Sequence, residues 1–386
     1  MNNPRKPDPT SRAVPKGAIL VCLDIGRRDA ADRSAEAKSL VESAGAPVVA
    51  IVLGRRDRPD AATFAGSGKV EEIRDAAQAH RAATVVFDHA LSAVQVRNLE
   101  KLLGEGGKPV RVLDRTDLIL EIFAQRARSH EGKLQVELAQ LQHASTRLVR
   151  GWTHLERQRG GLGKTGGPGE KQIELDRRQI GEKVKKLKER LKKVAKVRAT
   201  QRAGRSRSSA LKVSIVGYTN AGKSTLFNKL ARADAYVADQ LFATLDPTTR
   251  RLHLGEGRAA ILSDTVGFIR DLPHNLVAAF RSTLEETADA DLLLHVVDAA
   301  NPRHLEQIDA VNTVLREIGA LDVPQILVWN KIDQVAGASP EVIRDGCGKI
   351  LNIKASAVTG AGIEAIREAL VEVAREGEAG PVATAA

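Results

Sequence analysis

The stretch KVSIVGYTNAGKSTLFNKL, residues 212–230, joins an apolar run to a glycine-bracketed loop and then to a segment of helical period. We expect a strand over 213–216 and a helix that starts at Thr225. The loop between them, Gly217 to Ser224, fits the pattern GxxxxGK[ST], in which glycines let backbone N–H groups turn inward around phosphate groups. The sequence therefore predicts a phosphate-binding loop between a strand and a helix, as in doubly wound α/β folds.

Residue chemistry within this loop points to a nucleotide triphosphate. Lys223 would neutralise the β- and γ-phosphates, and the Ser224 hydroxyl would bind Mg²⁺. The helix adds the positive end of its dipole. Two similar stretches do not meet the pattern: GSGK, residues 66–69, lacks both the first glycine and the hydroxyl, and GLGKTG, residues 161–166, follows a polar segment that predicts a flexible loop.

Four further pieces follow in order, each at the end of an apolar run. FATLDPTTR places Thr244 to complete the Mg²⁺ shell and sense the γ-phosphate, and ILSDTVGF places Asp264 near the metal and the Gly267 amide near that phosphate. ILVWNKID ends at Asp333, whose carboxylate can accept two hydrogen bonds from guanine but not from adenine. IKASAVTGAGI offers a loop to close over the base. These pieces predict a guanine-nucleotide domain over residues 210–375.

Two positions bear on hydrolysis and cations. Ras-like GTPases place a glutamine after DxxG to orient the attacking water, and here Phe268 stands there. We therefore expect slow intrinsic hydrolysis that needs help from elsewhere. Asn220, inside the loop, could coordinate a K⁺ ion at the phosphates or could merely stabilise the turn, and the sequence leaves both readings open.

The rest of the chain predicts two further parts. Alternating apolar runs and helical periods over 17–125 indicate a small α/β domain with a largely parallel sheet. Seams at 4-3 spacing, Leu134 to Leu155 and then Ile173 to Val194, predict a helical hairpin over 126–199 with a glycine-rich tip carrying Arg157, Arg159, Lys164 and Lys171. We expect a disordered tail over 1–16, a basic linker over 200–209 and a second tail over 376–386.

Charge and composition limit the classes of partner that the protein is expected to bind. The 386 residues carry a net charge of +11, and fourteen Lys or Arg stand against two acids between Arg177 and Arg207. A solvated helix face usually mixes signs, so we favour an RNA backbone over plain solvation. Two cysteines exclude a disulfide framework and a cysteine zinc site. The absence of a long apolar run or lipidation motif predicts a cytoplasmic protein without membrane anchor, although a basic helix could bind anionic lipid weakly.

With these residues in view, residues 18–375 resemble the HflX family of ribosome-associated GTPases. The resemblance rests on HEGKLQVELAQLQHASTRLVRGWTHLERQRGG, DQLFATLDPTTRRLHL and DTVGFIRDLPHNLVAAFRSTLEET. It implies an N-terminal α/β domain, a helical hairpin and a G domain. It further implies a GTP-hydrolysing switch that binds the large ribosomal subunit and its rRNA, is stimulated by it, and dissociates stalled or vacant ribosomes under stress.

The resemblance also implies functional residues. Lys223, Thr244 and Gly267 would act in catalysis, and Ser224 and Thr244 would hold Mg²⁺ with Asp264 in the second shell. The implied GTP contacts are Gly217, Tyr218, Thr219, Asn220, Ala221, Gly222, Lys223, Ser224, Phe242, Ala243, Thr244, Leu245, Asp246, Asp264, Thr265, Val266, Gly267, Asn330, Lys331, Ile332, Asp333, Ser356, Ala357 and Val358. The hairpin tip GKTGGPGEKQIE departs from the family pattern by one extra residue and by Lys171. We expect a monomer. The alternatives are an RNA-binding factor whose nucleotide is structural, and a membrane-associated signalling GTPase.

Overall fold

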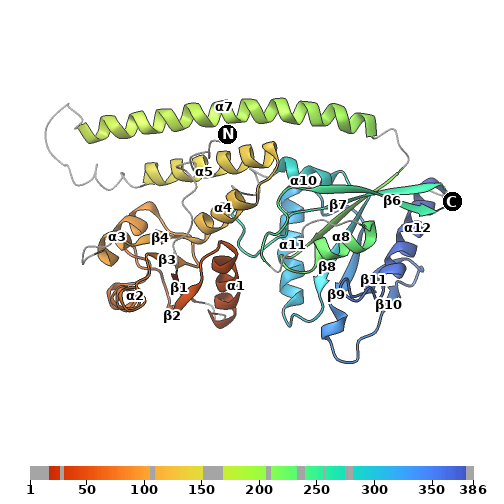
Figure 1. Cartoon of the computed structure of the whole chain (residues 1–386), viewed down its shortest axis with the longest axis horizontal. Helices are drawn as coiled ribbons and strands as arrows, with labels where there is room; N and C mark the ends of the chain where they lie inside the picture. Colours follow the sequence, from red (N-terminus) through yellow and green to blue (C-terminus); the bar gives the residue numbers. More distant parts are fainter. Residues whose placement is uncertain are drawn as a thin grey trace, which may run out of the picture. The chain divides into compact units, whose positions relative to one another are not determined.

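The computed structural model describes residues 17–26, 30–104, 109–150, 168–205, 210–232, 240–255, 257–273, 276 and 281–379 (Figure 1). The expected N-terminal tail, Trp152, Leu155 and the hairpin tip with Arg157, Arg159 and Lys164 lie outside these residues. The chain forms two compact units. One comprises Met1–Ala127 with Lys133–Leu191, and the other comprises Arg128–Gly132 with Lys192–Ala386.

A four-stranded parallel sheet is the centre of the first unit, as the sequence predicts. Its strands stand in the order β2-β1-β3-β4, which places β1 between two neighbours. Because β1 is covered on both faces, its run AILVCLDI is almost continuously apolar and buried. The strands are β1 (Ala18–Ile25), β2 (Val48–Arg56), β3 (Thr84–Phe87) and β4 (Arg111–Leu113). The helices are α1 (Ala30–Ser43), α2 (Ser67–Ala79), α3 (Ala93–Leu103) and α4 (Arg115–Arg126).

The helical hairpin consists of α5 (His130–Arg150) and α7 (Pro168–Arg205). Leu134 and Leu138 of α5 are buried against Leu187 of α7, and Leu141, Val184 and Leu191 pack around them. These six residues belong to the two predicted seams, so the hairpin is confirmed where the structure describes it. Helix α7 continues to Arg205, through the first part of the segment expected to be a linker.

A seven-stranded sheet is the centre of the second unit. The order is β10-β11-β9-β8-β5-β7-β6, with antiparallel pairing only of β6 with β7 and β10 with β11. The strands are β5 (Leu211–Gly217), β6 (Thr248–Gly255), β7 (Arg258–Asp264), β8 (Leu292–Asp298), β9 (Gln325–Asn330), β10 (Glu341–Arg344) and β11 (Ile350–Lys354). The helices are α8 (Lys223–Ala231), α10 (Arg281–Ala288), α11 (His304–Ile318), α12 (Ile363–Ala379) and the 3₁₀ turn η1 (Ile332–Gln334).

This arrangement confirms the predicted doubly wound, mainly parallel fold. Chain order reverses at β5, which has β7 on one side and β8 on the other. Side chains of these strands form one core with α8 and α12, including Ile215, Leu226 and Leu370. In open α/β sheets the crevice at such a reversal, outside the carboxyl ends of the strands, is where ligands bind.

Candidate nucleotide site

Glycines at two points let the loop after β5 pass close to its neighbours. A Cβ on Gly217 would lie 2.2 Å from the carbonyl oxygen of Val296 in β8. Gly222 has φ +92°, and a Cβ there would lie 2.2 Å from Nδ2 of Asn330. Any larger residue would have to push these groups aside. Helix α8 then begins at Lys223, so its amino end faces the loop.

A cavity of about 480 Å³ opens where this loop, the segment before β6 and the ends of β7 and β9 meet. Most of its lining belongs to residues predicted from the sequence. The lining residues are Thr219, Asn220, Gly222, Lys223, Ser224, Thr225, Gln240, Phe242, Ala243, Thr244, Thr265, Gly267, Asn330, Lys331, Gln334, Ala357 and Val358.

Sequence reasoning missed Thr225, Gln240 and Gln334 as lining residues. Thr225 and Gln334 directly adjoin predicted positions and Gln240 lies two residues before Phe242, and this proximity was the only signal for them. Ten predicted contacts do not line the cavity, because they form the layer beneath it or lie at its edge: Gly217, Tyr218, Ala221, Leu245, Asp246, Asp264, Val266, Ile332, Asp333 and Ser356.

Oxygen ligands converge beside the loop. The Ser224 hydroxyl donates to Oδ2 of Asp264 at 2.7 Å and lies 2.8 Å from the Thr244 hydroxyl. Asp264 is 1% exposed, and its Oδ1 has no hydrogen-bond partner among the described residues. Burial raises the pKa of this carboxyl, while the Ser224 hydrogen bond and the Lys223 charge oppose the shift. Two hydroxyls and a buried carboxylate with an unused oxygen match the ligand preference of Mg²⁺.

Lys223 is a buried cation at the foot of the cavity. Its side chain is buried, and its Nζ donates to the Tyr218 carbonyl at 2.7 Å. Burial lowers the pKa of Lys223 to about 8, although Asp264 acts in the opposite direction. An anionic phosphate next to Nζ would favour the charged form of Lys223. Without it, the site has too little negative charge to keep the pKa of Lys223 at its usual value, and this is the place where the sequence predicts phosphates.

Asn330 joins the phosphate loop to the loop after β11. Its Nδ2 donates to the Ala221 carbonyl at 2.8 Å, and its Oδ1 accepts from the Ala357 amide at 2.9 Å. Lys331 forms an ion pair with Asp298 at 2.7 Å, which fixes its stem at the cavity wall. Asp333 is exposed on η1 beside the lining residue Gln334. Asn330, Lys331 and Ala357 therefore line the cavity together, and Asp333 lies next to the lining residue Gln334 in sequence.

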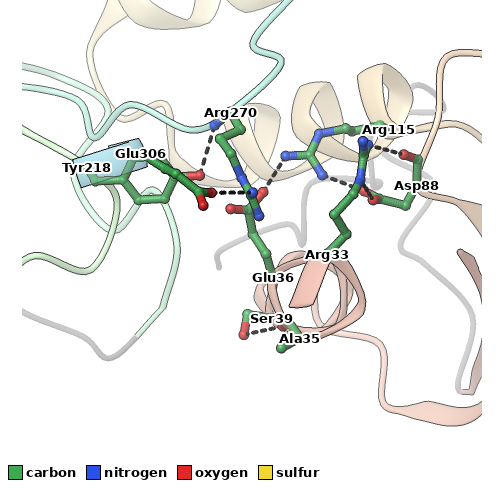
Figure 2. A network of polar contacts seen from close by, with 9 residues as sticks. All are labelled: Arg33, Ala35, Glu36, Ser39, Asp88, Arg115, Tyr218, Arg270 and Glu306. Carbon is green, nitrogen blue, oxygen red and sulfur yellow. Dashed lines mark hydrogen bonds and ion pairs between the residues drawn. The ribbon is translucent and has the colours of Figure 1, made fainter. Parts of the chain in front are cut away.

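Phe268 is turned away from the cavity. Its ring is fully buried, and its main chain pairs with the phosphate loop: its amide donates to Gly217 O at 3.2 Å, and its carbonyl accepts from Thr219 N at 2.7 Å. Polar contacts also hold Arg270, two residues later. Its amide donates to Tyr218 Oη at 2.9 Å, and its side chain forms an ion pair with Glu306 (Figure 2). Gly267 alone of this stretch borders the Lys223 ammonium, and a Cβ there would lie 2.9 Å from Nζ.

Sequence comparison identifies the family. Three family models match in succession: the GTP-binding GTPase N-terminal region at residues 31–124, its middle region at 126–205, and the 50S ribosome-binding GTPase family at 212–331. The Escherichia coli GTPase HflX is 53% identical over 355 residues, which span 92% of this chain and 82% of that protein. The chain belongs to the HflX family of GTPases. The resemblance predicted from the sequence is therefore confirmed.

Further relatives agree with this assignment. HflX of Caldanaerobacter subterraneus subsp. tengcongensis is 46% identical over 92% of this chain and 79% of its own length. Among solved structures, the complex of SsGBP with GDP aligns with a TM-score of 0.50 and 25% identity, covering 94% of this chain and 99% of that one. The GTPase class and the ribosome-binding family are thus established for this HflX-family chain.

Two other features bear on ligands and membranes. Asp114, Asp117 and His143 form the one described cluster with metal-ligand geometry, but Arg147 pairs with both carboxylates, at 2.9 and 2.6 Å, and supplies the positive charge there. Within the described part of the chain, no helix combines the length and apolar character needed to cross a bilayer.

Proposed function

We propose that this protein is a Mg²⁺-dependent GTP switch that binds the large ribosomal subunit, hydrolyses GTP faster in its presence, and dissociates stalled or vacant ribosomes under stress. One observation carries the proposal: the same chain joins a cavity lined by the predicted phosphate-loop and base-loop residues to a long helix whose exposed charged residues between Arg177 and Lys196 are ten basic and two acidic. The first feature provides a timed switch, and the second provides affinity for an RNA backbone.

The pocket assigns a role to each group. Lys223 and the amides at the start of α8 would hold the phosphates, and Asp333 would select guanine through its paired N–H groups. Ser224 and Thr244 would hold Mg²⁺, with Asp264 behind them, and the ion would neutralise charge on the phosphates. The loop around Ala357, held by Asn330, would close over the base.

Hydrolysis needs a group that the free protein does not supply at position 268. The Phe268 ring is fully buried and does not line the cavity, whereas Gly267 does. An apolar ring cannot orient water. We infer that the ribosome completes the water-positioning arrangement, and that Asn220, which lines the cavity, could add a K⁺ ion at the phosphates.

Helix α7 offers the ribosome-binding charge. Its described basic side chains are exposed between Arg177 and Lys196, while the apolar seam faces α5. Each phosphate that such a side chain neutralises releases counterions, so binding should weaken steeply with salt. The exposed basic residues are Arg177, Arg178, Lys183, Lys185, Lys186, Lys188, Arg190, Lys192, Lys193 and Lys196.

GTP turnover with and without purified large ribosomal subunits tests the proposal, in matched K⁺ and Na⁺ buffers and with Mg²⁺ or EDTA. We expect strong stimulation that disappears in Lys223→Ala and persists in Lys229→Ala, an exposed lysine on α8. Gradient sedimentation of vacant and of stalled ribosomes then shows whether turnover separates the subunits. Unstimulated turnover, with binding equal in GTP and GDP, would instead favour an RNA-binding factor whose nucleotide is structural.

A further inference from the structure

The segment that carries Thr244 also carries a carboxylate aimed at a helix. Asp246 lies two residues after Thr244 and immediately before Pro247. Its Oδ2 accepts from the backbone amides of Arg128 and Ser129, each at 2.8 Å, and its Oδ1 accepts from the Ser129 hydroxyl. All of these residues belong to the second compact unit. The contact therefore lies inside the unit that binds the nucleotide.

Ser129 and Asp246 together cap the amino end of helix α5. Ser129 directly precedes α5, and its hydroxyl accepts from the Gly132 amide at 2.8 Å, satisfying one of the free N–H groups of the first turn. Asp246 orients that hydroxyl and adds a negative charge at the positive end of the helix. A cap supplied from 117 residues away in sequence makes the start of α5 depend on the position of the Thr244 segment.

Gly132 leaves the space that the Asp246 carboxylate needs to approach the first turn of α5. A Cβ on Gly132 would lie 2.3 Å from Oδ1 of Asp246 and 3.0 Å from Oγ of Ser129. Alanine is the better helix former in an ordinary first turn. Here the glycine leaves room for the carboxylate, and no other described group comes as near to that position.

The other end of the segment contacts the nucleotide cavity. Phe242, Ala243 and Thr244 line it, and the Thr244 hydroxyl lies 2.8 Å from that of Ser224. Pro247 disfavours the helical conformation for Asp246, and only Leu245 separates Asp246 from Thr244, so the two residues are closely linked along the chain. In this structure Thr244 reaches the metal position while Asp246 caps α5, so the two contacts coexist.

We propose that Asp246 is the positioning residue that couples the state of the Thr244 segment to helix α5, and through α5 to the hairpin. With GTP and Mg²⁺ bound, Thr244 is held at Ser224 and the cap is closed. After hydrolysis the segment is released and the cap loosens. The inference rests on the proposed switch function, and linkage requires that anything fixing α5 also favours the GTP state by the same factor.

Gly132→Ala tests this coupling, with Gly181→Ala as matched control. Gly181 lies on exposed α7, and a Cβ there meets nothing within 4 Å, so the control makes the same substitution in a helix without a collision. The readout is hydrogen–deuterium exchange over residues 128–132 in a nonhydrolysable GTP analogue and in GDP, both with Mg²⁺ and without ribosomes. We expect exchange at least about five-fold slower in the analogue for the wild type and the control.

Gly132→Ala should exchange quickly in both nucleotides and should lose most of the stimulation by large subunits. Equal exchange over 128–132 in the two nucleotides, in the wild-type protein, would overturn the coupling. If the subunits still stimulated that protein, the proposed function would stand without it. Absence of stimulation in the wild type would overturn the proposed function, and the exchange difference would still decide the coupling.

Discussion

The two sheets place charged residues at the same point in the fold, but the described charges are paired with one another in the first and line a cavity in the second. In the first unit chain order reverses between β1 and β3, and beyond the end of β3 ion pairs join Asp88, Arg33, Arg115 and Glu36 (Figure 2). In the second unit the crevice at β5 holds a glycine-rich loop and about 480 Å³ of open space.

The comparison indicates what a sheet needs, besides a reversal of chain order, in order to bind a ligand. In the first unit long charged side chains pair with one another, and the Arg115 and Asp88 side chains are 6% and 1% exposed. In the second, Gly217 and Gly222 contribute no side chain, so the loop passes close to its neighbours and the cavity beside it stays open, with Lys223 and Lys331 in its lining. The topology of the sheet determines where the crevice lies, and the lack of side chains at the two glycines leaves space beside the loop.

Placing a side chain in the cavity should produce the largest effect on nucleotide binding. Gly222→Ala places a Cβ 2.2 Å from Asn330 Nδ2 at a residue with φ +92°, which forces the phosphate loop away from the base loop. We expect GDP affinity, measured by calorimetry, to fall by about 100-fold, roughly 3 kcal/mol. Gly255→Ala is the control, because Gly255 has φ +90° but nothing within 4 Å. Affinities within threefold of each other would contradict the assigned role of Gly222.

Removing one partner from the ion pairs of the first unit should destabilise that unit without changing nucleotide affinity. Asp88→Ala leaves Arg115 buried without one of its two carboxylate partners and removes the Arg33 ion pair. We expect the free energy of unfolding, from urea titration by circular dichroism, to fall by about 3–5 kcal/mol. GDP affinity should stay unchanged. Asp75→Ala, at a side chain 75% exposed on α2, should cost little; a similar loss there would show that the ion pairs are not the cause.

Acid should distinguish the two sheets, because one keeps buried charges paired and the other keeps a buried histidine neutral. His295, in the middle of β8, is 1% exposed, and burial lowers its pKa to about 4. The unfolded chain binds a proton below about pH 6.5, so stability is full above that value and declines as pH falls toward 4.

The loss of stability through His295 should amount to roughly 3 kcal/mol. His295→Gln should flatten the decline in unfolding free energy between about pH 6.5 and about pH 4, whereas His253→Gln, at an exposed position, should not. An unchanged slope in His295→Gln would assign the acid sensitivity to other groups.

The smallest predicted effect concerns Lys223, the buried lysine of the cavity lining. The pKa of Lys223 is lowered to about 8 without nucleotide, and phosphates raise it, so GDP binding takes up a proton above that pH. Affinity should fall about fourfold between about pH 7 and about pH 8.5. In Lys223→Arg the guanidinium stays charged, so the dependence over this interval should vanish even if affinity is lower overall. A wild-type affinity independent of pH would mean that Lys223 is charged before binding.

Much of the nucleotide site was predictable because it is local in sequence. Each motif spans a few residues at the end of one strand, and the doubly wound topology brings those ends together. Lys223, Ser224 and Thr244 therefore lie where the sequence predicts them around one cavity. The hairpin was predictable for a similar reason, because a 4-3 seam fixes the buried face of each helix.

Other features depend on contacts between distant residues. Nothing in DPTTR indicates that Asp246 caps a helix that begins at His130, and the same residue was expected to contact nucleotide. The sequence shows that Phe268 cannot orient water, but only the backbone bridge to Gly217 and Thr219 shows that its ring is buried away from the cavity.

By itself the sequence determined the fold class, the guanine-nucleotide motifs, the basic helix and the family, since each is encoded in short patterns whose chemistry does not depend on distant neighbours. The tertiary structure decided which residues line the cavity, which groups the carboxylate of Asp246 contacts and which ionisable groups are buried. These depend on burial and on partners far apart in the chain, and burial is what moves the pKa values of Lys223 and His295.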